Sequence, residues 1–262
     1  MAVSSWTENF LTDGFQQFPS LVDLKLVARA REYIDRDLRV NYDASRIVEY
    51  DNRSFCPDLL GTPEIQDLAS CPGVKSKLEE LFEPESVVCD DGQIAIRRAH
   101  NSAERHGPVA HIDGIPTSTN GMNGDELTPF TLLLAVFLSE VRAEFSGNFT
   151  VWPGTHTLMQ EYFRKRGPKA RSEGMPQVAL GTPRQLLCKP GDVVLCHYSL
   201  AHAAAVNTSD FDRYAVFFRL SHRTLDREKY KDAHETEWAH LTNIWTDWKI
   251  APPLTGTRKR LS

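Results

Sequence analysis

The 262-residue sequence lacks the features that would place it in a membrane or in the secretory pathway. No apolar run reaches the roughly 18–20 residues that a membrane-spanning helix needs. The first fifteen residues contain no basic stretch followed by an apolar one, so we expect no secretory signal. Internal repeats and low-complexity segments are absent as well. The sequence therefore predicts a globular protein that does not associate with membranes.

Cysteine is scarce, and its spacing excludes two common uses. The five cysteines are scattered, odd in number and never arranged as Cys-x-x-Cys, at Cys56, Cys71, Cys89, Cys188 and Cys196. A disulfide framework would need an even, regularly spaced set, and a structural zinc site usually has paired cysteines. We therefore expect reduced, mostly buried thiols and a cytoplasmic location.

Basic clusters are also scarce. The net charge is -5, and no long basic run precedes the tail at residues 258–260, which is expected to be a solvated chain end. Proteins that bind nucleic acid usually carry a basic patch or stripe. We therefore predict no nucleic-acid partner, and no feature of the sequence indicates an oligomeric state.

The N-terminal third is predicted to be mostly helical. Apolar residues recur at helical spacing over 5–13, over about 21–38 after a possible N-cap at Ser20, and over 63–70 and 74–82. The segment 41–57 has no clear period and is expected to be loop or edge structure. A short strand is expected at 15–18.

From residue 87 the hydrophobic period becomes that of strands, with a helix at about 158–166 and helical character again over 224–248. A glycine-rich phosphate loop and alternating strand-helix-strand units are both missing. This order predicts a β-sandwich or jelly roll with helices packed outside, in one domain over 1–262: helical support over 1–85, a β core over 86–222 and a helical tail over 223–262. The core strands are expected at 93–98, 111–113, 130–138, 149–152, 184–188, 193–197 and 213–220.

His111 and Asp113 are the first candidate site residues. Alternate residues of a strand point to the same face, so this imidazole and carboxylate would lie side by side. Together they make two thirds of the 2-His-1-carboxylate arrangement of non-haem iron oxygenases. A single His-x-Asp triplet is equally compatible with a hydrogen-bonded core histidine beside a turn aspartate.

A second stretch strengthens the metal hypothesis. His202 follows a predicted strand, and Arg213 opens the next one eleven residues later. Three protein ligands leave open positions on a metal for a 2-oxo acid and dioxygen, and an arginine can hold the far carboxylate of that acid with two parallel hydrogen bonds. The alternative for Arg213 is a surface ion pair with Asp210 or Asp212.

Four motifs in order make the chain similar to the phytanoyl-CoA dioxygenase family of Fe(II)/2-oxoglutarate-dependent oxygenases. They are His111-Ile112-Asp113, the stretch from Gly147 to His156 that includes Pro153-Gly154-Thr155-His156, Pro190-Gly191-Asp192, and the run His197, His202, Asn207, Arg213. The resemblance extends over roughly residues 10–222. It implies a double-stranded β-helix, a jelly-roll core of the cupin-like kind, with the site in its mouth.

The resemblance also implies roles for individual residues. His111, Asp113 and His202 would bind iron, and Arg213 would bind the 2-oxoglutarate carboxylate. Gln93 and Arg97 share one face of a predicted strand, where related enzymes hold the co-substrate or the substrate. We expect Gln93 to contact the co-substrate and Arg97 to contact the substrate.

The sequence supports specific expectations for four further positions. Ala204 stands where the family often has a serine that hydrogen-bonds 2-oxoglutarate, so this chain departs from the family pattern there. His197 is expected to support the ligands from behind, and His156 to order the Pro-Gly turn. Arg219 lies on the face of Arg213 and reaches either the cavity or the surface.

The predicted reaction is hydroxylation of an unactivated C–H bond of a small molecule by dioxygen, with release of succinate and carbon dioxide. In related halogenases a small residue replaces the carboxylate ligand, so Asp113 favours hydroxylation or desaturation over halogenation. Arginines near the site, including Arg97, suggest an anionic substrate. The alternatives are a jelly-roll metalloprotein that does not use 2-oxoglutarate, such as a cupin-like dioxygenase or isomerase, and a non-catalytic small-molecule binding module.

Overall fold

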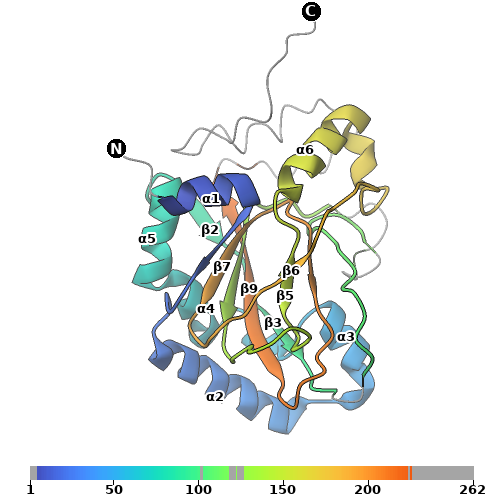
Figure 1. Ribbon diagram of the computed structural model, residues 1–262. Coiled ribbons are helices and arrows are strands. Elements are labelled where there is room, and N and C mark those ends of the chain that lie inside the picture. The colour runs from blue at the N-terminus through green and yellow to red at the C-terminus, as the bar shows by residue number, and fades with distance from the viewer. Residues whose placement is uncertain (1–4, 101–102, 118–121, 123–126, 224, 226–262) are drawn as a thin grey trace, which may run out of the picture.

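Two antiparallel sheets form the centre of the computed structural model, which describes residues 5–100, 103–117, 122, 127–223 and 225 (Figure 1). In the six-stranded sheet the order is β1-β7-β4-β9-β2, and β3 also pairs with β9. The three-stranded sheet has the order β6-β5-β8. The strands are β1 Phe15–Phe18, β2 Val87–Cys89, β3 Gln93–Arg97, β4 Leu132–Phe137, β5 Phe149–Val151, β6 Arg184–Gln185, β7 Val193–His197, β8 His202–Ala204 and β9 Arg213–His222.

The larger sheet is buried on both faces, which explains the nearly continuous apolar sequence of β4. Leu132, Leu134 and Val136 pack into one hydrophobic core, on the side of the N-terminal helices. The alternate residues Leu133, Ala135 and Phe137 pack into a second core that is shared with the smaller sheet. The two-residue period of the strand thus divides its side chains between two cores. This two-sheet architecture with flanking helices confirms the predicted mainly β, jelly-roll fold.

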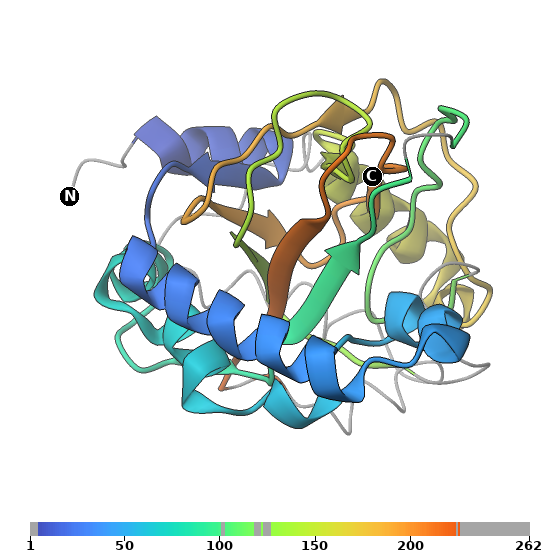
Figure 2. The ribbon, with the colours of Figure 1, turned by 90° about the horizontal axis from the view of Figure 1, so that it is seen from below.

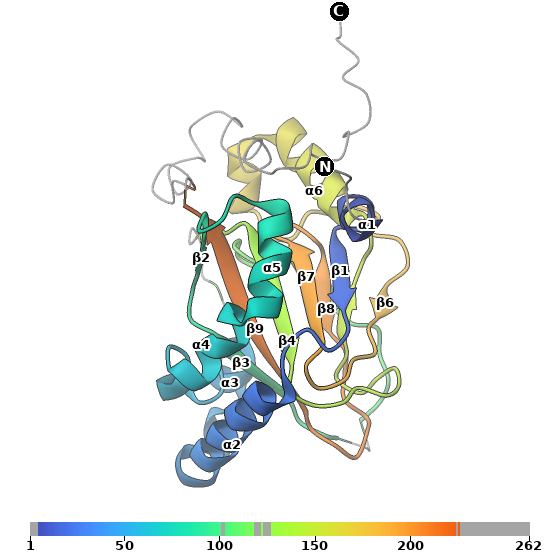
Figure 3. The same ribbon diagram turned by 90° about the vertical axis from the view of Figure 1, so that its left-hand side faces the viewer.

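Helices cover the outer face of the larger sheet (Figures 2 and 3). Buried residues of α2, α4 and α5, among them Ile34, Leu68 and Leu81, belong to the outer core. The helix α6 lies at one end of the molecule, near α1 in Figure 1. The α-helices are α1 Ser5–Asp13, α2 Leu24–Asn41, α3 Ile47–Asn52, α4 Pro63–Ser70, α5 Pro72–Leu81 and α6 Thr155–Arg166, and 3₁₀ turns are at Ala44–Arg46, Pro57–Leu59 and Pro168–Arg171.

Two predictions about local structure were wrong, one of them in part. Ser20 does not cap a helix: its φ is +51°, and the second helix begins at Leu24, where the side chain of Asp23 accepts a hydrogen bond from the Lys25 amide. The segment 41–57 is loop or edge structure only in part: Phe55 pairs with Ile94 of β3, but residues 44–52 form a 3₁₀ turn and α3. Tyr50 of α3 is buried and stacks on Phe55, with ring centroids 5.2 Å apart, so tertiary packing holds this helix.

The strand expected at 184–188 is shorter than predicted. Only Arg184–Gln185 form a strand, and β6 belongs to the smaller sheet whereas β7 belongs to the larger one. The tight turn between them is present, with the Asp192 amide donating to the Lys189 carbonyl at 3.0 Å. The helical tail expected over 224–248 lies almost entirely outside the described residues. Within the described part of the chain, no helix has the length and hydrophobicity to cross a membrane.

Candidate metal centre

The structure brings His111, Asp113 and His202 together at the mouth of the jelly roll. His111 and His202 form an antiparallel β-bridge, and each backbone amide donates to the carbonyl of the other at 2.9 Å. One ligand atom from each of the three residues lies within 4.8 Å of the others. Both imidazole Nε2 atoms lie 3.6 Å from Asp113 Oδ1. The bridge between two distant segments therefore builds the cluster.

These distances fit a shared metal ion better than direct hydrogen bonds. A separation of 3.6 Å is too long for a hydrogen bond between nitrogen and oxygen. Two ligand atoms that each lie about 2.1 Å from one ion are at most about 4.2 Å apart. The separations between the two Nε2 atoms and Oδ1 of Asp113 satisfy this limit.

The environment keeps the imidazoles suited to coordination. Nδ1 of His202 donates to the Leu200 carbonyl at 2.9 Å, which fixes the ring with Nε2 directed towards Asp113. Burial and the neighbouring His202 together lower the pKa of His111 to about 3. His111 is therefore neutral at physiological pH, as a metal ligand must be. Its Nδ1 is buried and has no hydrogen-bond partner among the described residues.

Asp113 is held as a carboxylate. Burial alone would raise the pKa of Asp113, but the guanidinium of Arg219 and the neighbouring His202 and His111 together outweigh burial and keep that pKa well below its ordinary value. Arg219 Nη2 lies 2.6 Å from Asp113 Oδ2, the oxygen that does not face the histidines. The two alternatives left open for Arg219 are thus resolved: it reaches into the site rather than the surface.

A cavity of about 100 Å³ joins the cluster to Arg213. Arg213 is 2% exposed, and it donates from Nε to the Gly147 carbonyl at 2.8 Å and from Nη1 to the Ala95 carbonyl at 3.1 Å. No carboxylate of the described residues lies within 4.0 Å of its guanidinium, so the predicted alternative of an ion pair with Asp210 or Asp212 is not formed. Burial, aided by the charge of Arg97, lowers the pKa of Arg213 to about 9. A buried cation without a counter-ion is a strong anion-binding group.

The other predicted residues line the same cavity. Gln93 accepts a hydrogen bond from Arg219 Nη1 at 3.1 Å. Arg97 is paired with Asp51 of α3 at 3.0 Å, a residue that gave no signal in the sequence because the helix was not predicted. Ala204 lies two residues after His202 on β8 and faces the cavity.

A larger cavity of about 870 Å³ adjoins the first one and shares four lining residues with it, Asn52, Gln93, Asp113 and Arg219. One part of its lining is polar, including Ser54, Asp90 and Asp91, and another part is apolar, including Leu127 and Phe130. This volume is within the range of about 300–1,000 Å³ that small-molecule sites occupy. The site therefore has an inner and an outer compartment, with Asp113 and Arg219 in the lining of both.

His156 and His197 line neither compartment and are not part of the His111–Asp113–His202 cluster. His156 and His197 are buried side by side, and His156 Nε2 lies 3.1 Å from the Leu11 carbonyl of α1.

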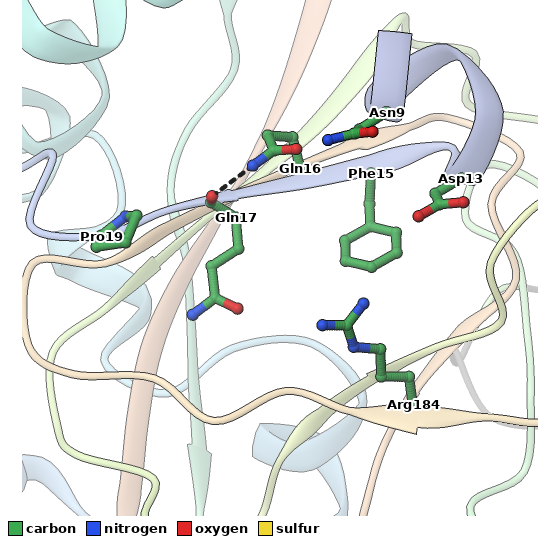
Figure 4. A pocket seen from close by; sticks show the side chains of 7 residues that line it. All are labelled: Asn9, Asp13, Phe15, Gln16, Gln17, Pro19 and Arg184. Carbon is green, nitrogen blue, oxygen red and sulfur yellow. Dashed lines mark hydrogen bonds between the residues drawn. The ribbon is translucent and has the colours of Figure 1, made fainter. Parts of the chain in front are cut away.

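A separate cavity of about 540 Å³ lies between the end of α1, β1 and β6 (Figure 4). None of the predicted site residues lines it. Its lining residues are Asn9, Asp13, Phe15, Gln16, Gln17, Pro19 and Arg184.

Comparison with known families supports the resemblance that the motifs predicted. The model of the family described as "Phytanoyl-CoA dioxygenase (PhyH)" matches residues 122–215. This range includes His202 and Arg213, while His111 and Asp113 precede it. No match was found among curated protein sequences.

Solved structures share the fold over most of the chain. HygX from Streptomyces hygroscopicus, with nickel and 2-oxoglutarate bound, is 20% identical, with a TM-score of 0.57 over 86% of this chain and 90% of HygX. The carbocyclase SnoK from nogalamycin biosynthesis, described as non-haem and α-ketoglutarate dependent, is 18% identical, with a TM-score of 0.57 over 84% of this chain and 83% of SnoK. The epimerase SnoN of the same pathway, described in the same terms, is 18% identical, with a TM-score of 0.54 over 83% and 81%.

Proposed function

This chain is phytanoyl-CoA dioxygenase-like in sequence and fold, and from that premise we propose that it is an Fe(II)- and 2-oxoglutarate-dependent dioxygenase of a small molecule. One observation carries the proposal. The buried guanidinium of Arg213, which forms no ion pair with a carboxylate of the described residues, shares a 100 Å³ cavity with the His111–Asp113–His202 cluster. A site for an acidic co-substrate thus adjoins a site for a metal.

The residues present fit an Fe(II) ion. Two neutral imidazoles and one carboxylate are the ligand set of non-haem iron oxygenases. The ion would supply a site at which 2-oxoglutarate and dioxygen react, with succinate and carbon dioxide as co-products. His111, Asp113 and His202 would hold it, and the Leu200 carbonyl would fix the ring of His202 through Nδ1.

The charges of the inner cavity favour a dianionic co-substrate. The lining of the inner cavity contains three arginines and two aspartates, Arg97, Arg213, Arg219, Asp51 and Asp113. When the histidines are neutral, its net charge is therefore +1. A divalent cation would make the cavity still more positive, and the two carboxylates of 2-oxoglutarate would compensate. Arg213 would bind the far carboxylate, since its remaining N–H groups have no competing carboxylate within reach among the described residues. Gln93 and Ala204 would contact the same co-substrate.

The outer cavity is the proposed substrate compartment. Its polar and apolar portions suit an amphipathic small molecule with hydrogen-bonding groups on one side. Structures similar to this chain include HygX with hygromycin B and SnoN with a nogalamycin compound. Arg97, expected from the sequence to favour an anionic substrate, is already paired with Asp51. We therefore place substrate recognition in the outer cavity, with Arg97 at the boundary of the inner one.

Hydroxylation is the proposed outcome. The carboxylate of Asp113 occupies the coordination position that a halide would need, which disfavours halogenation. Epimerisation and carbocycle formation are catalysed by similar folds, as SnoN and SnoK illustrate. Incorporation of one ¹⁸O atom from ¹⁸O₂ into the product distinguishes hydroxylation from both of these outcomes and from desaturation.

Anaerobic titration of the metal-free protein tests the proposal. Fe(II) is added first and 2-oxoglutarate second, and the visible absorption is recorded. We expect a metal-to-ligand charge-transfer band only when both are present, followed by succinate formation on exposure to air. Iron binding without a 2-oxoglutarate-dependent band would favour the cupin-like alternative. Absence of iron binding would leave the non-catalytic binding module as the better description.

Replacement of Ala204 by serine is expected to strengthen binding of 2-oxoglutarate. Ala204 faces the inner cavity, and a hydroxyl there can donate a hydrogen bond to a carboxylate. One such bond is worth about 1 kcal/mol net, which is roughly a fivefold lower dissociation constant. Calorimetric titration of 2-oxoglutarate into the Mn(II)-loaded protein measures the effect. Ala143→Ser makes the same substitution at an exposed position that lines neither compartment, and serves as control.

A further inference from the structure

Arg219 occupies an unusual position between the metal cluster and the outer cavity. It lies on β9, six residues after Arg213 and on the same face, and β9 runs beside β3 (Figure 2). Nη2 contacts Asp113 Oδ2 at 2.6 Å, and Nη1 donates to Gln93 Oε1 at 3.1 Å. The side chain is 31% exposed and lines both compartments. Two nitrogens of Arg219 therefore bind two different segments of the chain, one at Asp113 and one at Gln93 of β3.

The two oxygens of Asp113 are used separately. Oδ1 lies 3.6 Å from Nε2 of both histidines, whereas Oδ2 is bound by Arg219. A carboxylate held in this way presents one oxygen to the histidine pair and has its second oxygen occupied. We propose that Arg219 is a positioning residue that makes Asp113 a one-oxygen metal ligand and keeps a coordination position open. This inference rests on the proposed function, because it requires that the cluster bind a metal.

The chemistry of arginine suits this task. Its planar guanidinium can bind a carboxylate with one nitrogen and an amide oxygen with another, which fixes the direction of both contacts. Lysine would keep the charge but would have a single nitrogen for the two partners. Gln93 therefore completes the arrangement: it accepts from Nη1 of Arg219 while its own amide nitrogen donates to the Arg53 carbonyl.

Cobalt(II) binding tests the inference without turnover. Co(II) is less readily oxidised than Fe(II), and its visible absorption reports how many ligands bind the ion. Groups that orient metal ligands typically contribute 10- to 100-fold to metal affinity. We expect Arg219→Met to weaken Co(II) binding by about 10- to 100-fold and to change the visible spectrum, because the freed Oδ2 can also coordinate. Arg219→Lys should retain part of the Co(II) affinity, but its visible spectrum should differ from that of the wild type.

Arg98→Met is the matched control. Arg98 also forms a short ion pair, 2.7 Å from Asp212, and it does not line either compartment. Its loss removes the same charge and the same type of contact, so Co(II) affinity and spectrum should stay at wild-type values. Circular dichroism and thermal unfolding verify that each variant is folded. If Arg219→Met does not fold, Gln93→Leu removes the second contact of Arg219, and a weaker affinity with a shifted spectrum is expected.

The outcomes separate this inference from the proposed function. Wild-type protein that binds no Co(II) or Fe(II) would overturn the proposed function. Wild-type binding with an unchanged dissociation constant and spectrum in folded Arg219→Met, or in Gln93→Leu where Arg219→Met does not fold, would overturn the positioning role alone. Equal weakening in Arg219→Met and Arg98→Met would also overturn it, because the effect would then come from general loss of charge.

Discussion

Replacement of His202 by alanine is expected to weaken Fe(II) binding by more than about 100-fold, beyond the range typical of residues that only orient metal ligands. The substitution removes one of three candidate ligands and leaves Asp113 and His111. Because the backbone of residue 202 keeps both hydrogen bonds to residue 111, the fold should persist. The expected loss is therefore one of coordination rather than of structure. Isothermal titration with Mn(II) and with Fe(II) under anaerobic conditions measures it.

Two further measurements make this prediction specific. His106→Ala removes a histidine from an exposed loop position and should bind metal like the wild type. Free imidazole should partly restore metal binding to His202→Ala, because the deleted ring leaves a space beside the cavity. Metal affinity in His202→Ala equal to that of His106→Ala would show that the cluster is a buried polar group and not a metal centre.

Sequence reasoning predicted the cluster because its signals are local. The two-residue period of a predicted strand placed His111 and Asp113 on one face, and His202 and Arg213 were predicted to flank the next strand connection. The strand expected at 111–113 is not formed: His111 makes only an isolated β-bridge with His202, and Asp113 lies in a turn. The strands β1 and β7 and the helix α4 have the bounds that were expected. In each of these segments the hydrophobic period and the flanking turn residues agree.

The features that the sequence did not predict depend on contacts between distant segments. The helix α3 has six residues and no apolar period; its Tyr50 packs on Phe55, and Phe55 in turn forms a β-bridge with the distant Ile94 of β3. Asp51 therefore could not be assigned to the cavity. The pairing of Arg219 with Asp113 joins residues 106 positions apart. The strand period predicted the face of Arg219 but not how far its side chain reaches.

Replacement of Arg213 by methionine is expected to abolish productive binding of 2-oxoglutarate while metal binding is retained. Truncating one member of a buried, hydrogen-bonded charge pair costs about 2–5 kcal/mol, which is roughly a 30- to 5,000-fold rise in dissociation constant. The guanidinium of Arg213 donates to the Gly147 and Ala95 carbonyls and forms no hydrogen bond or ion pair with His111, Asp113 or His202. The charge-transfer titration should therefore show iron bound and the band lost at co-substrate concentrations that saturate the wild type.

Arg213→Lys and Arg97→Met identify which property of Arg213 matters. Lysine keeps a charge but lacks the planar fork, so affinity should fall between the wild type and Arg213→Met. Arg97 already has Asp51 as its counter-ion, so Arg97→Met should weaken 2-oxoglutarate binding far less than Arg213→Met does. Methionine also leaves the Gly147 and Ala95 carbonyls without their donor, and thermal unfolding is therefore measured in parallel. Wild-type affinity in a folded Arg213→Met protein would mean that the buried guanidinium serves the strand ends and that the co-substrate, if any, is held elsewhere.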